Sequence, residues 1–130
     1  LRQAHRIEPE KTSILVPLGF SLVRLDRPYE AVATLARAIA IEPTAAEPHR
    51  ALGVAASSLG WYDIAENELR QALKIDPDDS DSAFNLAILL ASRDPDNVEE
   101  AKTWYLRARE LSGQSDPALE RVLGVKPQGK

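Results

Sequence analysis

The sequence predicts an all-α fold, a solenoid of stacked antiparallel helix pairs, and three observations support this prediction. First, positions recur every 34 residues, as Pro9, Pro43 and Pro77 do. Second, each period holds two helical stripes of apolar residues separated by a turn signal. Third, hydrophobic residues make up 44% of the chain but aromatic residues only 5%, which suits closely approaching helices packed through alanine and leucine. The 34-residue step also recurs in further sets of positions: Leu1, Leu35 and Leu69; Ala4, Ala38 and Ala72; Ile7, Ile41 and Ile75; Leu18, Leu52 and Leu86; Gly19, Gly53 and Ala87.

The period divides the chain into segments. These are a partial repeat at 1–11, helix-pair units at 12–45, 46–79 and 80–115, a C-terminal capping helix at 116–125 and a flexible tail at 126–130. The partial repeat matches the closing half of a preceding unit, so we expect the chain to be a piece of a longer protein. A short amphipathic helix is expected after the third unit, because a terminal repeat has one face without a neighbour.

The first unit is expected to contain two helices. The apolar stripe of its first helix consists of Leu15, Leu18, Leu22 and Leu25. The turn at 26–28 ends this helix, and Pro43 ends the second one, because proline cannot continue a helix. Pro17 lies inside the first helix, so that helix either begins late, near Pro17, or is kinked there.

Turn and cap residues delimit the second unit. Gly60 separates its two helices, and Pro77 ends the unit. One of Asp78, Asp79 or Ser80 is expected to cap the next helix with a side-chain oxygen.

The third unit departs from the period. Ala65 and Ala101 are 36 residues apart, which places a two-residue insertion in its inter-helix loop, where insertions are tolerated. Asn97 followed by Glu100 resembles a capping box. The sequence 116–117, Asp-Pro, is an N-cap followed by proline at the first helical position of the capping helix.

Composition argues against several classes of protein. The chain has 16 basic and 20 acidic residues, a net charge of −4. Nucleic acids and anionic membranes attract basic surfaces, so neither is an expected partner. No apolar run reaches the ~20 residues of a membrane span. We expect a soluble domain without membrane insertion. The cellular compartment stays unknown, because any signal peptide would lie outside this piece of the protein. The chain lacks cysteine, so its redox compartment also stays open.

The chain offers few candidates for catalysis or metal binding. Its two histidines, His5 and His49, lie in different repeats without a partner at i+3 or i+4. His49 is expected to be a packing residue and His5 an exposed one. Four carboxylates gather between the second and third units: Asp76, Asp78, Asp79 and Asp81. They lack the ligand spacing of a calcium loop and suit a turn that caps a helix. We therefore expect no enzymatic activity, no metal and no cofactor.

A 34-residue helix-turn-helix with Leu-Gly in its first helix resembles the tetratricopeptide repeat. The second unit resembles it at the following signature positions: Leu52, Gly53, Gly60, Tyr62, Ala65, Leu69, Ala72 and Pro77. The first unit supplies Leu18, Gly19, Ala31, Leu35, Ala38 and Pro43, and the third Leu86, Ala87, Ala101, Tyr105 and Ala108, with Gly113 where proline is usual. The resemblance covers residues 1–113. It implies a right-handed superhelix whose concave groove is lined by the first helix of each unit.

Carrying over the family's groove positions predicts a binding site. Its residues are Val16, Phe20, Arg24, Arg50, Val54, Ser57, Asp81, Phe84, Asn85 and Ile88. The apolar members would form a strip, with Arg24 and Arg50 as cationic contacts at its margin. Such a strip suits an amphipathic helix or an extended peptide with an acidic group near Arg50. Alternatively, a preceding part of the protein or another copy of the chain covers this strip.

We therefore expect a non-catalytic protein-protein interaction module that binds a protein or peptide ligand. The alternative is a structural scaffold, a homo-oligomer that associates through its open N-terminal end or its apolar groove. A third hypothesis is regulation of an enzyme domain outside this chain. Two specialised functions of the family are not indicated. A site for a terminal carboxylate would have only Arg50 and Asn85 near the positions that the family uses. The positions of an asparagine ladder, one per unit, are occupied by Pro17, Ala51 and Asn85.

Overall fold

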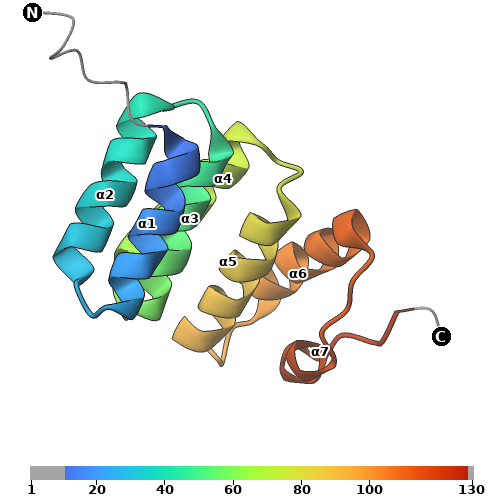
Figure 1. The fold of residues 1–130 in the computed structure, drawn as a ribbon. Coiled ribbons are helices and arrows are strands. Elements are labelled where there is room, and N and C mark those ends of the chain that lie inside the picture. Colours follow the sequence, from blue (N-terminus) through green and yellow to red (C-terminus); the bar gives the residue numbers. More distant parts are fainter. Residues whose placement is uncertain (1–10, 129–130) are drawn as a thin grey trace, which may run out of the picture.

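The computed structural model describes residues 11–128, and within them it has seven α-helices and no strand. Six helices form three antiparallel pairs: α1 (Thr12–Arg24) with α2 (Pro28–Ile41), α3 (Ala46–Ser58) with α4 (Tyr62–Ile75), and α5 (Ser80–Arg93) with α6 (Glu99–Ser112). The short helix α7 (Pro117–Leu123) follows the third pair (Figure 1). The predicted all-α solenoid with a C-terminal capping helix is confirmed. His5 and all but the last residue of the predicted partial repeat 1–11 lie outside the described residues.

Consecutive pairs stack on one another. Helix α2 packs against α3, and α4 packs against α5. The first helices also meet along the stack, because α3 contacts both α1 and α5. Helix α7 packs against α5 and α6 at the end of the stack opposite to the first pair (Figure 1). None of the helices between residues 11 and 128 has both the length and the apolar character needed to cross a membrane.

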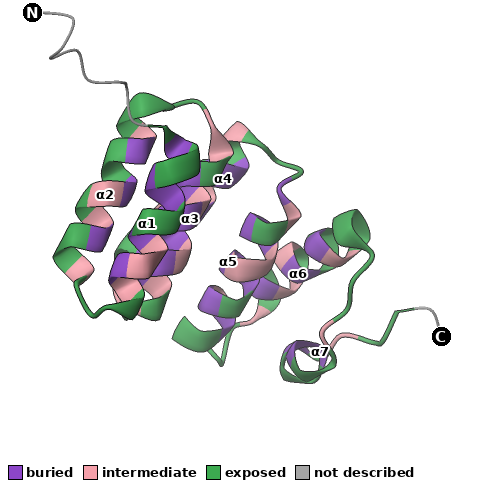
Figure 2. Cartoon of the chain, in the orientation of Figure 1, coloured by how far each residue is buried: buried purple, intermediate pink, exposed green. Residues whose placement is uncertain are grey.

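The core is a row of clusters between neighbouring helices rather than one central core (Figure 2). The first cluster, from α1 to α3, contains Leu15, Val16, Leu35, Ala38, Ala51, Leu52 and Ala55. The second, from α3 to α6, contains Ala56, Ala65, Leu69, Leu73, Ala83, Leu86, Leu89 and Ala108. The third, from α5 to α7, contains Ala87, Ala91, Ala101, Tyr105, Leu119 and Leu123. Each cluster draws on more than one pair or on α7, so each unit depends on its neighbour.

A small residue marks the close approach of the two helices in the first two pairs. A β-carbon added at Gly19 would lie 2.5 Å from Leu35 Cγ, and one added at Gly53 would lie 2.8 Å from Leu69 Cγ. Both leucines are fully buried. The third pair has Ala87 and Tyr105 in the corresponding cluster. The helices therefore approach one another because these positions carry little or no side chain.

Several turn and cap residues singled out in the sequence occupy such positions in the structure. The turn after α1 contains Asp26 at φ 61°, and the turn after α3 contains Gly60 at φ 81°. Of the three residues considered for the cap of α5, Asp79 is the N-cap, and its carboxylate accepts from Ser82 N. Asp116 caps α7 by accepting from Leu119 N at 3.0 Å.

The predicted capping box at Asn97 and Glu100 is wrong. Helix α6 begins at Glu99 after the N-cap Val98, which makes no side-chain cap bond. The carboxylate of Glu100 instead accepts from Arg70 Nη1 at 2.7 Å and from Trp104 Nε1 at 3.2 Å. The ion pair with the neighbouring helix pair holds this side chain away from the start of its own helix.

Of the two alternatives for Pro17, the late start of α1 is wrong. The helix begins at Thr12 and continues through Pro17 to Arg24. Proline lacks an amide hydrogen, so the carbonyl of Ser13 loses its usual intrahelical donor. The ring of Pro17 is exposed to solvent.

The predicted leucine stripe of α1 is only half buried. Leu15 and Leu22 are buried, whereas Leu18 is 45% and Leu25 is 65% exposed. Leu52, one period after Leu18, is only 5% exposed, because it packs with α1 and α2 side chains of the preceding pair. Periodicity places Leu18 on the correct face, but no described helix precedes α1 to cover that face.

The close contacts at the glycines predict an order of stability among variants. Gly19→Ala and Gly53→Ala gain helix propensity but overlap with buried leucines, and we expect net losses of about 1–3 kcal/mol, larger at Gly19. Thermal unfolding followed by circular dichroism measures these losses of stability. The control is Asn67→Ala, at an exposed position of α4. Unchanged midpoints for both glycine variants would contradict the packing described above.

Candidate functional site

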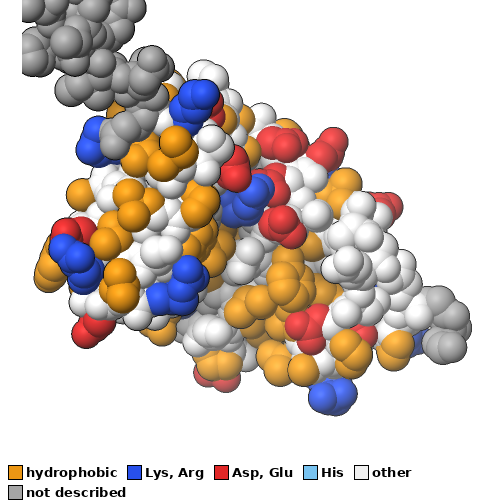
Figure 3. Space-filling view, viewed as in Figure 1, with side chains coloured by type: hydrophobic (Ala, Val, Ile, Leu, Met, Phe, Trp, Pro, Cys, Tyr) orange, Lys and Arg blue, Asp and Glu red, His pale blue; other side chains and the backbone are white. Residues whose placement is uncertain are grey.

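The residues predicted to line a groove all lie on α1, α3 and α5, which follow one another along the stack. Arg24, Asp81 and Ile88 are exposed, and Val16 is buried. The remaining ones are half-buried: Phe20, Arg50, Val54, Ser57, Phe84 and Asn85. Hydrophobic side chains gather over α5, with acidic side chains beside them (Figure 3). The first helices thus leave apolar surface open to a partner.

The strip is narrower at α1 than predicted. Val16 is only 8% exposed, because it packs into the cluster between α1 and α3. Phe20 packs partly against the same cluster and keeps part of its ring in contact with solvent. The open apolar surface therefore consists of Phe20, Val54, Phe84 and Ile88 rather than of five residues.

Arg50 has a partner within the chain. Its Nη1 donates to Asp79 Oδ2 at 2.7 Å, and this carboxylate is buried at the start of α5. The ion pair joins α3 to α5, so Arg50 positions helices instead of offering a free cation. Arg24 remains exposed, and its guanidinium donates to Ser21 Oγ at 3.3 Å on its own helix.

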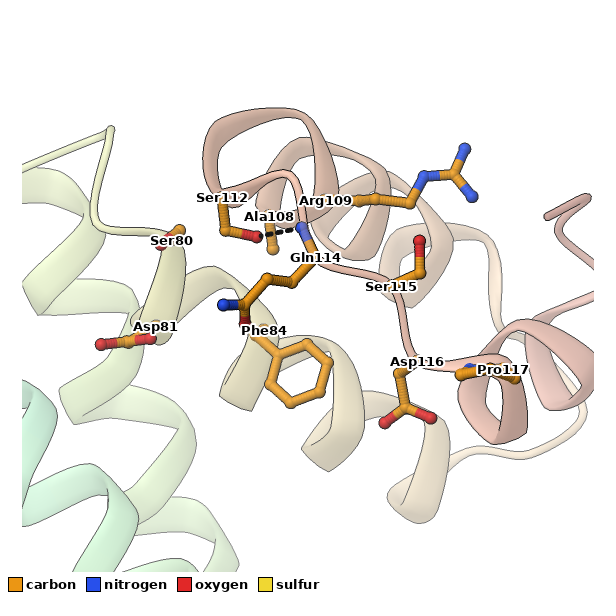
Figure 4. Close-up of a pocket in the computed structure, with 10 residues that line it drawn as sticks. All are labelled: Ser80, Asp81, Phe84, Ala108, Arg109, Ser112, Gln114, Ser115, Asp116 and Pro117. Atoms are coloured by element: carbon orange, nitrogen blue, oxygen red, sulfur yellow. Dashed lines mark hydrogen bonds between the residues drawn. The ribbon is translucent and has the colours of Figure 1, made fainter. Parts of the chain in front are cut away.

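A pocket of about 250 Å³ lies between α5, the C-terminal end of α6 and the loop to α7 (Figure 4). Its lining residues are Ser80, Asp81, Phe84, Ala108, Arg109, Ser112, Gln114, Ser115, Asp116 and Pro117. The ring of Phe84 lies in the middle of this view and is 6.4 Å from the ring of Tyr105. Only Asp81 and Phe84 were predicted as site residues, since the other walls depend on where α7 packs.

A buried polar network holds α7 and thereby one wall of this pocket. Tyr105 Oη donates to Glu120 Oε2 at 2.5 Å and accepts from Asp116 N at 2.9 Å. Arg109 Nη1 donates to Glu120 Oε2 at 3.0 Å, and its guanidinium lies 5.7 Å from the centre of the Tyr105 ring. Glu120 is only 4% exposed. Because a buried carboxylate is costly without partners, these bonds determine where α7 lies.

The network shifts two pKa values. The hydrogen bond from Tyr105, followed by the bond from Arg109, outweighs burial and holds the pKa of Glu120 below its ordinary value of 4.5. Burial and then the bond to Glu120 raise the pKa of Tyr105 above its ordinary value of 10.0. The network thus favours an ionised Glu120 and a neutral Tyr105 at physiological pH.

The second helices carry paired charges instead. Arg70 of α4 donates to Glu100 of α6 at 2.7 Å, and Arg93 at the end of α5 donates to Asp63 of α4 at 2.7 Å. The hydrogen bond from Arg70 lowers the pKa of Glu100 below its ordinary value. This side of the second and third pairs is therefore cross-linked by its own ion pairs.

The discounted catalytic and metal candidates have structural partners. His49 is buried, and its Nδ1 lies 2.7 Å from Glu68 Oε1, which agrees with the predicted packing role. Asp78 accepts from Arg107 Nη2 at 3.0 Å. Across residues 11–128, no three histidine, aspartate or glutamate side chains converge in the way a metal site requires.

The lowered pKa of Glu120 predicts acid sensitivity. Its contribution to stability is present above the ordinary glutamate value and is lost as pH falls through the lowered value. We expect α7 to detach in that range, which fluorescence of Trp104 in a Trp61→Phe background reports, since Trp104 packs against the third cluster. Glu120→Gln removes this transition. The exposed control Glu110→Gln retains it, and an identical acid transition in Glu120→Gln would contradict the role of the network.

Comparisons with known proteins identify one repeat in the sequence. The model of the tetratricopeptide repeat matches residues 46–79, the bounds of the second predicted unit. No curated protein matches the sequence.

Solved structures are similar in fold. The crystal structure of MamA has a TM-score of 0.74 at 18% identity, over 95% of this chain and 70% of that one. The first tetratricopeptide-repeat domain of Spaghetti (RPAP3), bound to the HSP90 peptide SRMEEVD, has a TM-score of 0.75 at 17% identity, over 91% and 94%. The type III secretion translocator chaperone SycD of Yersinia enterocolitica has a TM-score of 0.74 at 17% identity, over 87% and 89%. Residues 46–79 thus match the tetratricopeptide repeat, and the chain has an all-α solenoid fold similar to that of these solved structures.

Proposed function

We propose that this chain is a non-catalytic protein-interaction module that binds a peptide or an amphipathic helix along α1, α3 and α5. The observation that carries the proposal is the row of incompletely buried apolar side chains on these helices, Phe20, Val54, Phe84 and Ile88. Isolated exposed apolar residues are common, but a contiguous row on a rigid frame is typical of an interaction site. The peptide bound to the similarly folded Spaghetti domain supports this class of function.

The charges along the row favour a ligand with a defined direction. Arg24 is exposed on α1, and Asp81 is exposed on α5. A ligand with an acidic group near α1 and a basic group near α5 would complement both. Between these ends, apolar side chains of the ligand would contact Val54 and Ile88.

The opposite side offers less to a partner. Arg70, Arg93 and Arg107 are each bound to acidic groups of neighbouring helices or loops. A ligand there would have to compete with existing ion pairs. The first helices are therefore the better candidate surface.

Two isoleucines of nearly equal exposure allow a matched test. Ile88 on α5 is 39% exposed, and Ile64 on α4 is 40% exposed. For a peptide selected from a random display library, we expect Ile88→Glu to weaken binding about tenfold or more, as loss of a central apolar contact does. Ile64→Glu should leave the affinity nearly unchanged. Fluorescence anisotropy measures both, and equal effects of the two substitutions would place recognition elsewhere.

A second candidate function is self-association through the open face of α1. Ile14 is 60% and Leu18 is 45% exposed. The residues at the same positions of the following repeats are buried. Pro48 and Ser82 correspond to Ile14, and Leu52 corresponds to Leu18. The fold uses this face to bury one unit against another, so a second copy of the chain could cover it.

Self-association predicts a concentration-dependent mass. Sedimentation equilibrium over a dilution series should show a dimer that Ile14→Glu with Leu18→Glu converts to a monomer, because two charges would enter an apolar contact. The pair Ile64→Glu with Val122→Glu, on other exposed surfaces, should leave the mass unchanged. A wild-type monomer throughout the series would exclude this candidate.

A further inference from the structure

The second helix pair shows how this repeat binds a guanidinium group. Arg50 extends from α3 toward the start of the next first helix, where its Nη1 donates to Asp79 Oδ2 at 2.7 Å. The same oxygen accepts from Ser82 Oγ at 2.8 Å. Both donors are supplied by the chain itself, so the N-cap carboxylate of α5 is fully used.

After the third pair, an aspartate again caps the next helix, but the two side-chain donors equivalent to Arg50 and Ser82 are absent. Asp116 is the N-cap of α7, as Asp79 is of α5. Phe84 stands one period after Arg50, and Leu119 stands three residues after Asp116, where Ser82 stands relative to Asp79. Asp116 Oδ1 accepts from Leu119 N, and Oδ2 has no hydrogen bond or ion pair from the residues between 11 and 128. This oxygen is available to a ligand.

The missing arginine side chain leaves space as well as an unused acceptor. The pocket of about 250 Å³ lies between Phe84 and Asp116. Ala108 and Pro117 add apolar wall, and Asp81 adds a second carboxylate at its edge. Figure 4 shows the Phe84 ring and the Asp116 carboxylate on the same side of the α6–α7 loop.

We propose that this pocket binds an arginine side chain of a partner peptide. The guanidinium would lie against the Phe84 ring and donate to Asp116 Oδ2, while its methylene stem contacts Ala108 and Pro117. Arginine fits better than lysine because a planar group can stack on the ring and donate in the same plane. The proposal rests on the proposed function, since the pocket adjoins the α5 end of the peptide-binding row and gives that end its specificity.

The chain's own Arg109 does not take this place, although it lines the pocket. Its Nη1 donates to Glu120 Oε2 at 3.0 Å and to the carbonyl of Lys126 at 2.8 Å. In Figure 4 its guanidinium points away from Phe84. Because Glu120 neutralises Arg109, the Asp116 carboxylate is the charged group that lies beside the Phe84 ring (Figure 4).

A titration that needs no natural partner tests the proposal. N-acetyl-arginine methylamide is added to ¹⁵N-labelled protein, and N-acetyl-citrulline methylamide, of the same shape without the charge, is the control ligand. We expect arginine to shift amide signals of residues 80–84 and 113–119 and to bind about fivefold more tightly than citrulline, the worth of a solvent-accessible ion pair. Equal affinities, or arginine shifts confined to other residues, would overturn the proposal.

Two variants test the atoms involved. Asp116→Asn keeps an N-cap for α7 but removes the charge, so arginine should bind about fivefold more weakly and citrulline equally well. Phe84→Arg restores the pattern of the second pair and should abolish arginine binding by filling the pocket. Should Phe84→Arg fail to fold, Asp116→Asn alone decides, and unchanged arginine binding by it would refute the assignment. Peptide binding that Ile88→Glu weakens without any preference for arginine would refute this proposal and leave the proposed function standing.

Discussion

The rest of this structure depends on one kind of contact inside each helix pair. A residue with little or no side chain on the first helix packs against a large, buried side chain on the second helix. Gly19 and Gly53 leave no room for a β-carbon beside Leu35 and Leu69. This close approach lets alanines fill the remaining space, and those at 31, 38, 65 and 72 are fully buried. A core of alanine and leucine with few aromatic residues is therefore sufficient, because the helices rather than large side chains occupy the volume.

Close packing within the pairs determines what the surface can do. Each first helix uses two of its faces for neighbours, so only its remaining face can meet a ligand. At the C-terminal end the neighbour is α7, and it is fixed by Tyr105, Arg109 and Glu120. Those three residues also position the loop that closes the pocket beside Phe84. The candidate site is thus a consequence of how the last repeat is capped.

The sequence predicted the helices and turns better than it predicted which side chains are covered by neighbouring helices. The structure has helices paired as the period predicts, a turn at Gly60 and N-caps at Asp79 and Asp116. Periodicity identifies which residues share a face of a helix but not which neighbour covers that face, so Leu18 and Leu25 belong to the predicted apolar stripe and yet are exposed. Long-range ion pairs are equally hidden from it: Glu100 was expected at a capping box and pairs with Arg70, and Arg50 was expected at a ligand and pairs with Asp79. The pocket was missed because its loop wall has no periodic pattern.

In a repeat protein, equivalent positions of successive repeats have different neighbours. Comparing these positions shows which role of a residue depends on its neighbours. The position of Val16 recurs as Arg50 and then as Phe84, and each serves a different need. Val16 fills a core cluster, Arg50 neutralises the N-cap of α5, and Phe84 leaves the N-cap of α7 with an unused oxygen. The Phe84 ring also packs against the second and third core clusters, so it contributes to stability where Arg50 forms an ion pair. The exchange of arginine for an aromatic ring therefore adds core packing and leaves at Asp116 the acceptor that we propose an arginine of a partner uses.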